Sequence, residues 1–105
     1  MSNFCQLWLT CADKKEANKI AYTLLEKHLV ACVHQMPISS TFHWKGEIAS
    51  TNEVLLQMES SFDLFDKVEA EVAKLHSYEA FVLEAVPALK VSKKAQAWLT
   101  EELNG

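Results

Sequence analysis

The chain has 105 residues and a net charge of −4, with ten lysines, fourteen carboxylates and no arginine. This length suits one domain with one core, so we expect a single domain over residues 1–105. Arginine is the usual reader of phosphate and guanine, and a basic stripe usually marks a nucleic-acid binder. Both are missing from this sequence, so nucleic acid is an unfavourable partner.

No apolar run approaches the ~20 residues that cross a bilayer. The segment Met1–Phe4 has no basic stretch and leads directly into a predicted strand. We therefore expect no membrane partner, no signal peptide and a cytoplasmic location.

The three cysteines, Cys5, Cys11 and Cys32, are an odd number without CxxC spacing, which does not indicate a disulfide framework. Each lies in apolar sequence, where cysteine behaves as a small hydrophobe. We expect buried thiols at these positions.

The first predicted strand, 4–10, is apolar on both faces and therefore reads as a central strand. A helix follows, and Asp13 with Glu16 has the spacing of a capping box at its start. Its apolar stripe repeats at helical spacing and contains Ala17, Ile20, Ala21, Leu24, Leu25 and Leu29.

A long hairpin is predicted next. Its first arm runs over 30–36 and 38–44, with Pro37 marking a bulge or kink because proline cannot donate a ladder hydrogen bond. The dipeptide Lys45-Gly46 forms the turn, and 47–59 returns as the second arm. Each arm could reach ~40 Å at about 3.3 Å per residue, which exceeds a typical strand.

The rest of the chain predicts a second helix capped by Ser60 or Ser61, with the stripe Phe65, Val68, Val72 and Leu75. A polar connection over 76–79 leads to a strand over 80–86, ended by Pro87. Ser92 is expected to cap a short last helix.

This order predicts an α+β fold, a ferredoxin-like βαββαβ sandwich with a long hairpin and an extra C-terminal helix. The helices cover one sheet face, and the hairpin also presents Phe42 and Trp44. An apolar sheet face of that size usually has a partner, and self-association is the simplest cover.

Several segments resemble the CutA divalent-ion tolerance family in order and spacing, over nearly the whole chain. They are Thr10-Cys11 with Asp13, 29–33 with Pro37, 42–47, 53–56, 76–79 and 97–99. The resemblance implies a ferredoxin-like subunit in a homotrimer whose hairpins pair between subunits. It also implies a link to divalent metals, copper above all, and it names no reaction.

Some positions depart from the family pattern. Glu59 stands where the family usually has lysine, Ser77 and Phe81 replace prolines, Val82 replaces a glutamate and His34 replaces an asparagine. Further departures are Val91 for a glycine and Ala95 for a tyrosine.

Of the metal-binding positions that the resemblance implies from some members of the family, only His76 matches. The cysteine equivalent is Leu9, and Cys11 follows two residues later.

The candidate site is built around the predicted connection after the second helix. His76 is the predicted metal ligand, and Tyr78 and Glu79 are predicted ligand-binding residues facing Trp44 of a neighbouring hairpin. The alternative for His76 is a helix-end histidine that complements the helix dipole. Cys11 is a second predicted metal ligand, because the start of a helix lowers a thiol pKa; its alternative is a buried thiol.

His34 and His43 could form a cross-strand or intersubunit pair, although solvated or interface histidines are the commoner case. Trp44 could line a pocket, although a packing anchor is the commoner role for such an aromatic side chain.

The function expected from this pattern is a trimeric CutA-like protein that binds a divalent metal, Cu(II) before others, or a small ligand between subunits. One alternative is a PII-like small-molecule signalling trimer, which is analogy of fold alone. Another is an acylphosphatase-like enzyme, whose phosphate grip depends on arginine. The sequence has no recognisable catalytic set, so we expect no enzyme.

Overall fold

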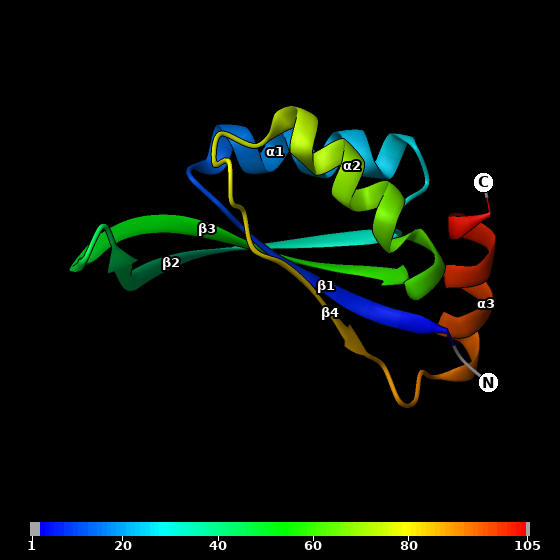
Figure 1. Cartoon of the computed structure of the whole chain (residues 1–105). Helices are drawn as coiled ribbons and strands as arrows, with labels where there is room; N and C mark the ends of the chain where they lie inside the picture. Colours follow the sequence, from blue (N-terminus) through cyan, green and yellow to red (C-terminus); the bar gives the residue numbers. More distant parts are fainter. Residues whose placement is uncertain (1–2, 105) are drawn as a thin grey trace.

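The computed structural model describes residues 3–104, and its elements follow the predicted order (Figure 1). They are β1 (Phe4–Cys11), α1 (Lys14–Glu26), β2 (Cys32–Trp44), β3 (Glu47–Ser61), a 3₁₀ turn (Phe62–Leu64), α2 (Phe65–Leu75), β4 (Leu83–Pro87) and α3 (Lys93–Leu103). The strands form one antiparallel sheet in the order β2-β3-β1-β4. Helices α1 and α2 cover one face, and α3 lies across one end. The predicted ferredoxin-like α+β fold is confirmed.

The strand β1 is central, as its two apolar faces predict. It pairs with β3 on one side and β4 on the other. Alternate residues Cys5, Leu7, Leu9 and Cys11 are fully buried under the helices, whereas the residues between them are half-buried. The predicted buried thiols are therefore found at Cys5 and Cys11, while Cys32 is only partly covered.

The core lies between the sheet and the stripes of α1 and α2. Fully buried side chains from the helices include Ala17, Ile20, Leu24, Val68 and Val72. They meet Leu56 and Met58 of β3 and the buried face of β1. Burying one such Val, Leu or Ile is worth about 1.5–3 kcal/mol, so this layer holds the helices against the sheet.

The hairpin of β2 and β3 is uninterrupted. Pairing continues through Pro37, which lies opposite Val54, so the predicted bulge is wrong. The reason is that β2 is an edge strand, where a proline whose nitrogen faces away from the partner removes no ladder bond. The turn residues Lys45 and Gly46 have φ of 50° and 80°, the left-handed pair that a two-residue hairpin turn requires.

The helix caps differ from one another. The Asp13 carboxylate accepts a 2.8 Å bond from the Glu16 backbone N–H, as predicted. The cap predicted for the second helix is wrong: Ser61 makes no side-chain cap bond, and Ser60 belongs to β3. Ser92 stands at the start of α3 without a side-chain bond.

Strand β4 begins three residues later than predicted, because 76–82 serve as its connection.

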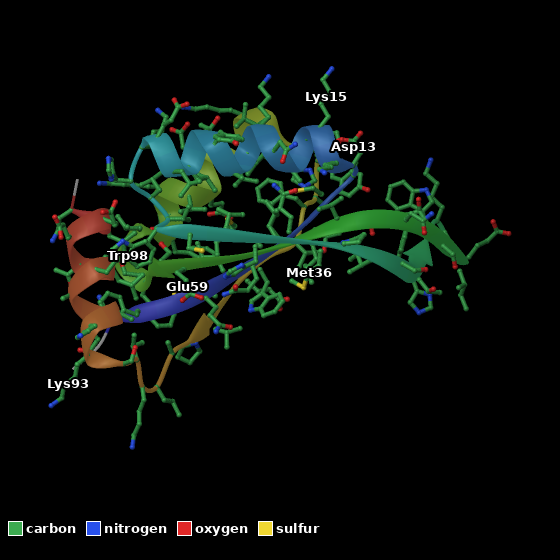
Figure 2. The ribbon with its side chains drawn as sticks, turned by 180° about the vertical axis from the view of Figure 1, so that it is seen from behind. Asp13, Lys15, Met36, Glu59, Lys93 and Trp98 are labelled. Carbon is green, nitrogen blue, oxygen red and sulfur yellow. The ribbon has the colours of Figure 1, made fainter. Side chains whose placement is uncertain are left out.

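No helix within residues 3–104 covers the second face of the sheet (Figure 1). Figure 2 shows Met36 and Glu59 projecting from this face, away from α1. We call it the open face. Among the described residues, no helix is both long and apolar enough to cross a membrane.

We predict that Ser60→Ala lowers the free energy of unfolding by about 1–2 kcal/mol. The buried Ser60 hydroxyl donates a 2.7 Å bond to the Leu29 carbonyl, and its loss leaves a buried acceptor unsatisfied. Ser61→Ala is the matched control and should change stability by less than about 0.5 kcal/mol. Equal effects in urea denaturation would show that the Ser60 hydroxyl has no such role.

Candidate functional site

The candidate site lies where the end of β1, the start of α1 and the loop after α2 meet. The donor atoms of Cys11, Glu16 and His76 all lie within 4.8 Å of one another there. We call these three residues the His76 cluster. Residues more than sixty positions apart are thus brought together, including the two predicted metal ligands.

The His76 side chain is fully buried, and both ring nitrogens have partners. Nε2 lies 2.8 Å from the Thr10 carbonyl oxygen, which only accepts, so Nε2 carries the proton. Nδ1 then accepts the Tyr78 backbone N–H at 3.0 Å. The ring stacks on Phe81 at 5.3 Å between centroids. His76 is therefore held as a neutral imidazole of one tautomer, with Nδ1 on the side of Glu16.

Glu16 joins two segments of the chain. Its carboxylate accepts backbone N–H groups from Ala12 at 2.8 Å and from Ser77 at 2.6 Å. Burial acts to raise the Glu16 pKa, but the hydrogen bonds from Ser77 and Ala12, with the charge of the His76 ring when it is protonated, together lower it. The carboxylate thus stays ionised and acts as an anionic anchor for the loop.

The Cys11 thiol does not have the character that its position predicts. Burial, followed by the charges of Glu16, Asp13 and Glu53, raises its pKa to about 12. The expected lowering of the thiol pKa by the helix start is wrong, because three carboxylates and burial outweigh the dipole. Cys11 is a protonated thiol unless a metal displaces its proton.

A second pair extends the site along β3. The Tyr78 hydroxyl donates a 2.6 Å bond to the Glu53 carboxylate, which is only 7% exposed. This bond, with burial and the Glu53 charge, raises the Tyr78 pKa to about 12. Glu53 is a polar side chain that sequence reasoning passed over. Its only signal is a lone carboxylate directly before an apolar strand segment.

The other predicted ligand-binding residues lie outside the cluster. Trp44 is 61% exposed near the tip of the hairpin, with the Lys45 ammonium 5.6 Å from its ring centroid. Glu79 is exposed in the connection to β4. His34 and His43 are nine positions apart on a strand without a bulge, so they project from opposite faces and do not pair within one chain.

Three of the positions that differ from the pattern of the resemblance make contacts in the structure. Ser77 supplies the N–H that Glu16 accepts, and Phe81 supplies the ring stacked on His76. Glu59 accepts a 2.7 Å bond from the Gln57 side chain on the open face. The first two of these positions therefore shape the His76 cluster directly.

The His76 cluster has one feature of a metal site and one obstacle. A metal-binding histidine usually donates its other ring N–H to a carbonyl or carboxylate, as Nε2 does here to Thr10. Nδ1 lies 3.8 Å from Glu16 Oε2, close to the ~3 Å between ligands on one ion. The obstacle is that a metal at Nδ1 must replace the Tyr78 N–H bond.

The profile of the CutA1 divalent ion tolerance family matches residues 5–102. The chain belongs to this family. The divalent-cation tolerance protein CutA of Archaeoglobus fulgidus is 36% identical over 101 residues, which covers 96% of this chain and 97% of that protein. CutA of Thermus thermophilus is 31% identical, covering 89% and 91%.

Solved structures agree with this assignment. The CutA structure from Archaeoglobus fulgidus, described as periplasmic, superposes with a TM-score of 0.93 at 33% identity, covering 95% of this chain and 98% of that one. Rice CutA1 superposes with a TM-score of 0.91 at 25% identity, covering 94% and 92%. The names describe ion tolerance and give no sign of an enzymatic reaction.

We predict that Glu16→Gln destabilises the protein by about 1–3 kcal/mol at neutral pH, because the two N–H donors lose a charged acceptor. The folded-state pKa of Glu16 is lowered, so its contribution is complete above the unfolded value and is lost as pH falls through the folded value. The stability gap between wild type and variant should therefore narrow below about pH 4.3.

Urea denaturation at several pH values measures this gap. Glu26→Gln, on the exposed end of α1, is the control and should leave stability within about 0.5 kcal/mol. A Glu16 gap that stays constant down to low pH would contradict the anchoring role.

Proposed function

We propose that this CutA-family protein binds a divalent metal, Cu(II) before others, at the His76 cluster, and that it works as a homotrimer. The observation that supports this most is the Nε2–H bond to Thr10, which fixes His76 with Nδ1 facing Glu16. Imidazole and carboxylate are hard-to-borderline donors, and copper binds nitrogen and oxygen sites most tightly among the divalent ions. Metal tolerance is then the function of the whole 1–105 domain.

Within this proposal the residues have different roles. His76 Nδ1 and a Glu16 oxygen are the first ligands. Metal ligands must carry a free lone pair, which the ionised Glu16 carboxylate and the unprotonated His76 Nδ1 both have. Cys11 joins only by losing its proton, and its pKa of about 12 makes this step costly at neutral pH. Tyr78 and Glu79 belong to the connection 76–82, and the Tyr78 N–H must release Nδ1 before a metal can bind there. We therefore retain both as ligand-binding residues.

The trimer proposal rests on the uncovered sheet and hairpin. Trp44, Ile48 and Phe42 are 61%, 73% and 39% exposed on the hairpin, and Val82 and Val86 are exposed near β4. Exposed apolar groups of this size on a sheet usually meet another chain. Contact between Trp44 of one copy and the Tyr78 region of the next would complete the predicted cleft.

The alternatives need phosphate-binding groups. A PII-like regulator and an acylphosphatase-like enzyme both hold a phosphate-bearing ligand, whereas the His76 cluster presents a carboxylate, a thiol and a neutral imidazole. Anions are repelled by the ionised Glu16, and the chain has no arginine. We therefore propose a binding protein without enzymatic activity, and retain the cytoplasm as its compartment, although one relative is described as periplasmic.

We predict that His76→Ala abolishes or weakens Cu(II) binding by more than about tenfold, since even residues that only orient a ligand are worth about 10–100-fold. His43→Ala, on the exposed hairpin, is the control and should bind as wild type. Calorimetric titration of the three proteins at one pH measures this. If His76→Ala binds Cu(II) like wild type, the copper lies elsewhere and the metal role of the cluster is excluded.

We predict a trimer in native mass spectrometry and sedimentation equilibrium at micromolar concentration. Trp44→Ala should loosen the assembly, because truncating a packed aromatic costs ~3–5 kcal/mol. Tyr22→Ala removes an aromatic side chain that is 66% exposed on α1, and it should leave the trimer intact. A monomeric wild type, or equal trimer stability in the two variants, would contradict the proposed interface.

A further inference from the structure

Helix α3 carries its charges in the order that its own dipole disfavours. Lys93 and Lys94 lie in the first turn, and Glu101 and Glu102 lie near the end of the helix. A helix has partial positive charge at its N-terminus and partial negative charge at its C-terminus, so these four side chains are unfavourably placed. Helix α2 has the favourable order, with an acidic residue in its first turn and a basic residue in its last.

The exposed side of α3 joins two of these charges to an aromatic side chain. Lys94, Ala97, Trp98 and Glu101 are spaced by three and four residues, so they lie along one face of the helix. All four are exposed, and Trp98 is 46% exposed. We call these four residues the α3 stripe. Lys94 and Glu101 take part in no ion pair within residues 3–104, so both charges are available to a partner.

The α3 stripe is complementary to a second copy of itself. Its midpoint lies between Ala97 and Trp98. When two α3 helices pack antiparallel about this midpoint, Lys94 of one copy lies opposite Glu101 of the other. The Trp98 ring then lies against the small Ala97 side chain of the second copy. Each contact occurs twice, as in an isologous interface.

The antiparallel arrangement also resolves the unfavourable charge order. It brings the lysines of one helix beside the negative end of the other helix's dipole, and the glutamates beside its positive end. Charges that oppose the dipole of their own helix are therefore favourable toward the second copy.

We propose that α3 is a docking surface for the α3 of a second copy of this chain, held antiparallel by two Lys94–Glu101 ion pairs around Trp98. Figure 1 shows α3 at the end of the sheet opposite the hairpin tip, and Figure 2 labels Trp98 at that end. The α3 stripe shares no residue with the surfaces proposed for the trimer, which are the hairpin and the apolar groups near β4. The contact thus joins two assemblies and does not build one, and it needs no metal.

A single α3 pair is a weak contact. The helix has 11 residues and is about 16 Å long, so two such helices bury less than the ~1,200 Å² of a standard interface. Exposed ion pairs add little each and are screened by salt. We therefore expect pairing that rises with protein concentration and falls as salt is added. Several α3 contacts between two trimers would strengthen it by avidity.

Sedimentation velocity of the full chain over a concentration series at low salt measures the pairing. Wild type should shift toward twice the mass that it has at low concentration. Lys94→Glu and Glu101→Lys should each weaken the pairing at least about tenfold, because both symmetric ion pairs become like-charge pairs. The double variant Lys94→Glu/Glu101→Lys exchanges the two charges and should restore pairing to within about threefold of wild type.

Two further variants complete the set. Trp98→Ala should weaken the pairing by more than about tenfold, since an aromatic side chain at the centre of an interface carries much of its binding energy. Lys19→Glu makes the same charge change as Lys94→Glu on the exposed side of α1, and it should pair as wild type does. Each single charge change in α3 favours the dipole of its own helix, so a loss of pairing cannot come from a weakened helix.

Three outcomes would overturn the proposal. The first is a wild type that shows no doubling of mass up to about 1 mM. The second is pairing in Lys94→Glu and Glu101→Lys that equals wild type, or a double variant that stays as impaired as the single ones. The third is dissociation of the trimer itself by Lys94→Glu, which would place the α3 stripe inside the trimer interface.

Discussion

The site depends on one carboxylate. Glu16 accepts N–H groups from Ala12, at the end of β1, and from Ser77, in the loop after α2. These bonds fix the loop against the start of α1, and the loop carries both His76 and Tyr78. The Thr10 carbonyl then selects the tautomer of His76, and the Tyr78 hydroxyl meets Glu53. The site is thus organised largely by contacts with backbone groups.

The same contacts set the conditions for metal binding. Nδ1 of His76 accepts a hydrogen bond from the Tyr78 backbone N–H, so an ion must compete with that bond. The Glu16 carboxylate beside the ring attracts a cation, while the raised Cys11 pKa makes proton release from the thiol costly. A binding site of this kind favours the strongest divalent competitor for nitrogen and oxygen donors, which is copper.

Much of the fold could be predicted from the sequence, because periodicity and turn chemistry are local. The Asp13 cap, the stripe with Ile20 and Leu24, and the Lys45-Gly46 turn follow from near neighbours. The bulge predicted at Pro37 is wrong, because the effect of a proline on pairing depends on whether its strand lies at the sheet edge, which is a tertiary property. The Glu16–Ser77 and Tyr78–Glu53 bonds were not predicted, since they join residues 61 and 25 positions apart. For Glu16 the sequence predicts only a capping role, because its partner Ser77 is remote along the chain.

The metal role proposed for His76 requires that the ring be held as the Nε2–H tautomer, with Nδ1 as an acceptor facing Glu16. Long-range ¹H–¹⁵N correlation spectra of the metal-free protein report this directly, with His76→Ala to assign the ring signals. We predict a protonated Nε2 and an unprotonated Nδ1 at neutral pH. A ring with the proton on Nδ1 would contradict it, because Nδ1 could then neither accept the Tyr78 N–H nor offer a lone pair to a metal.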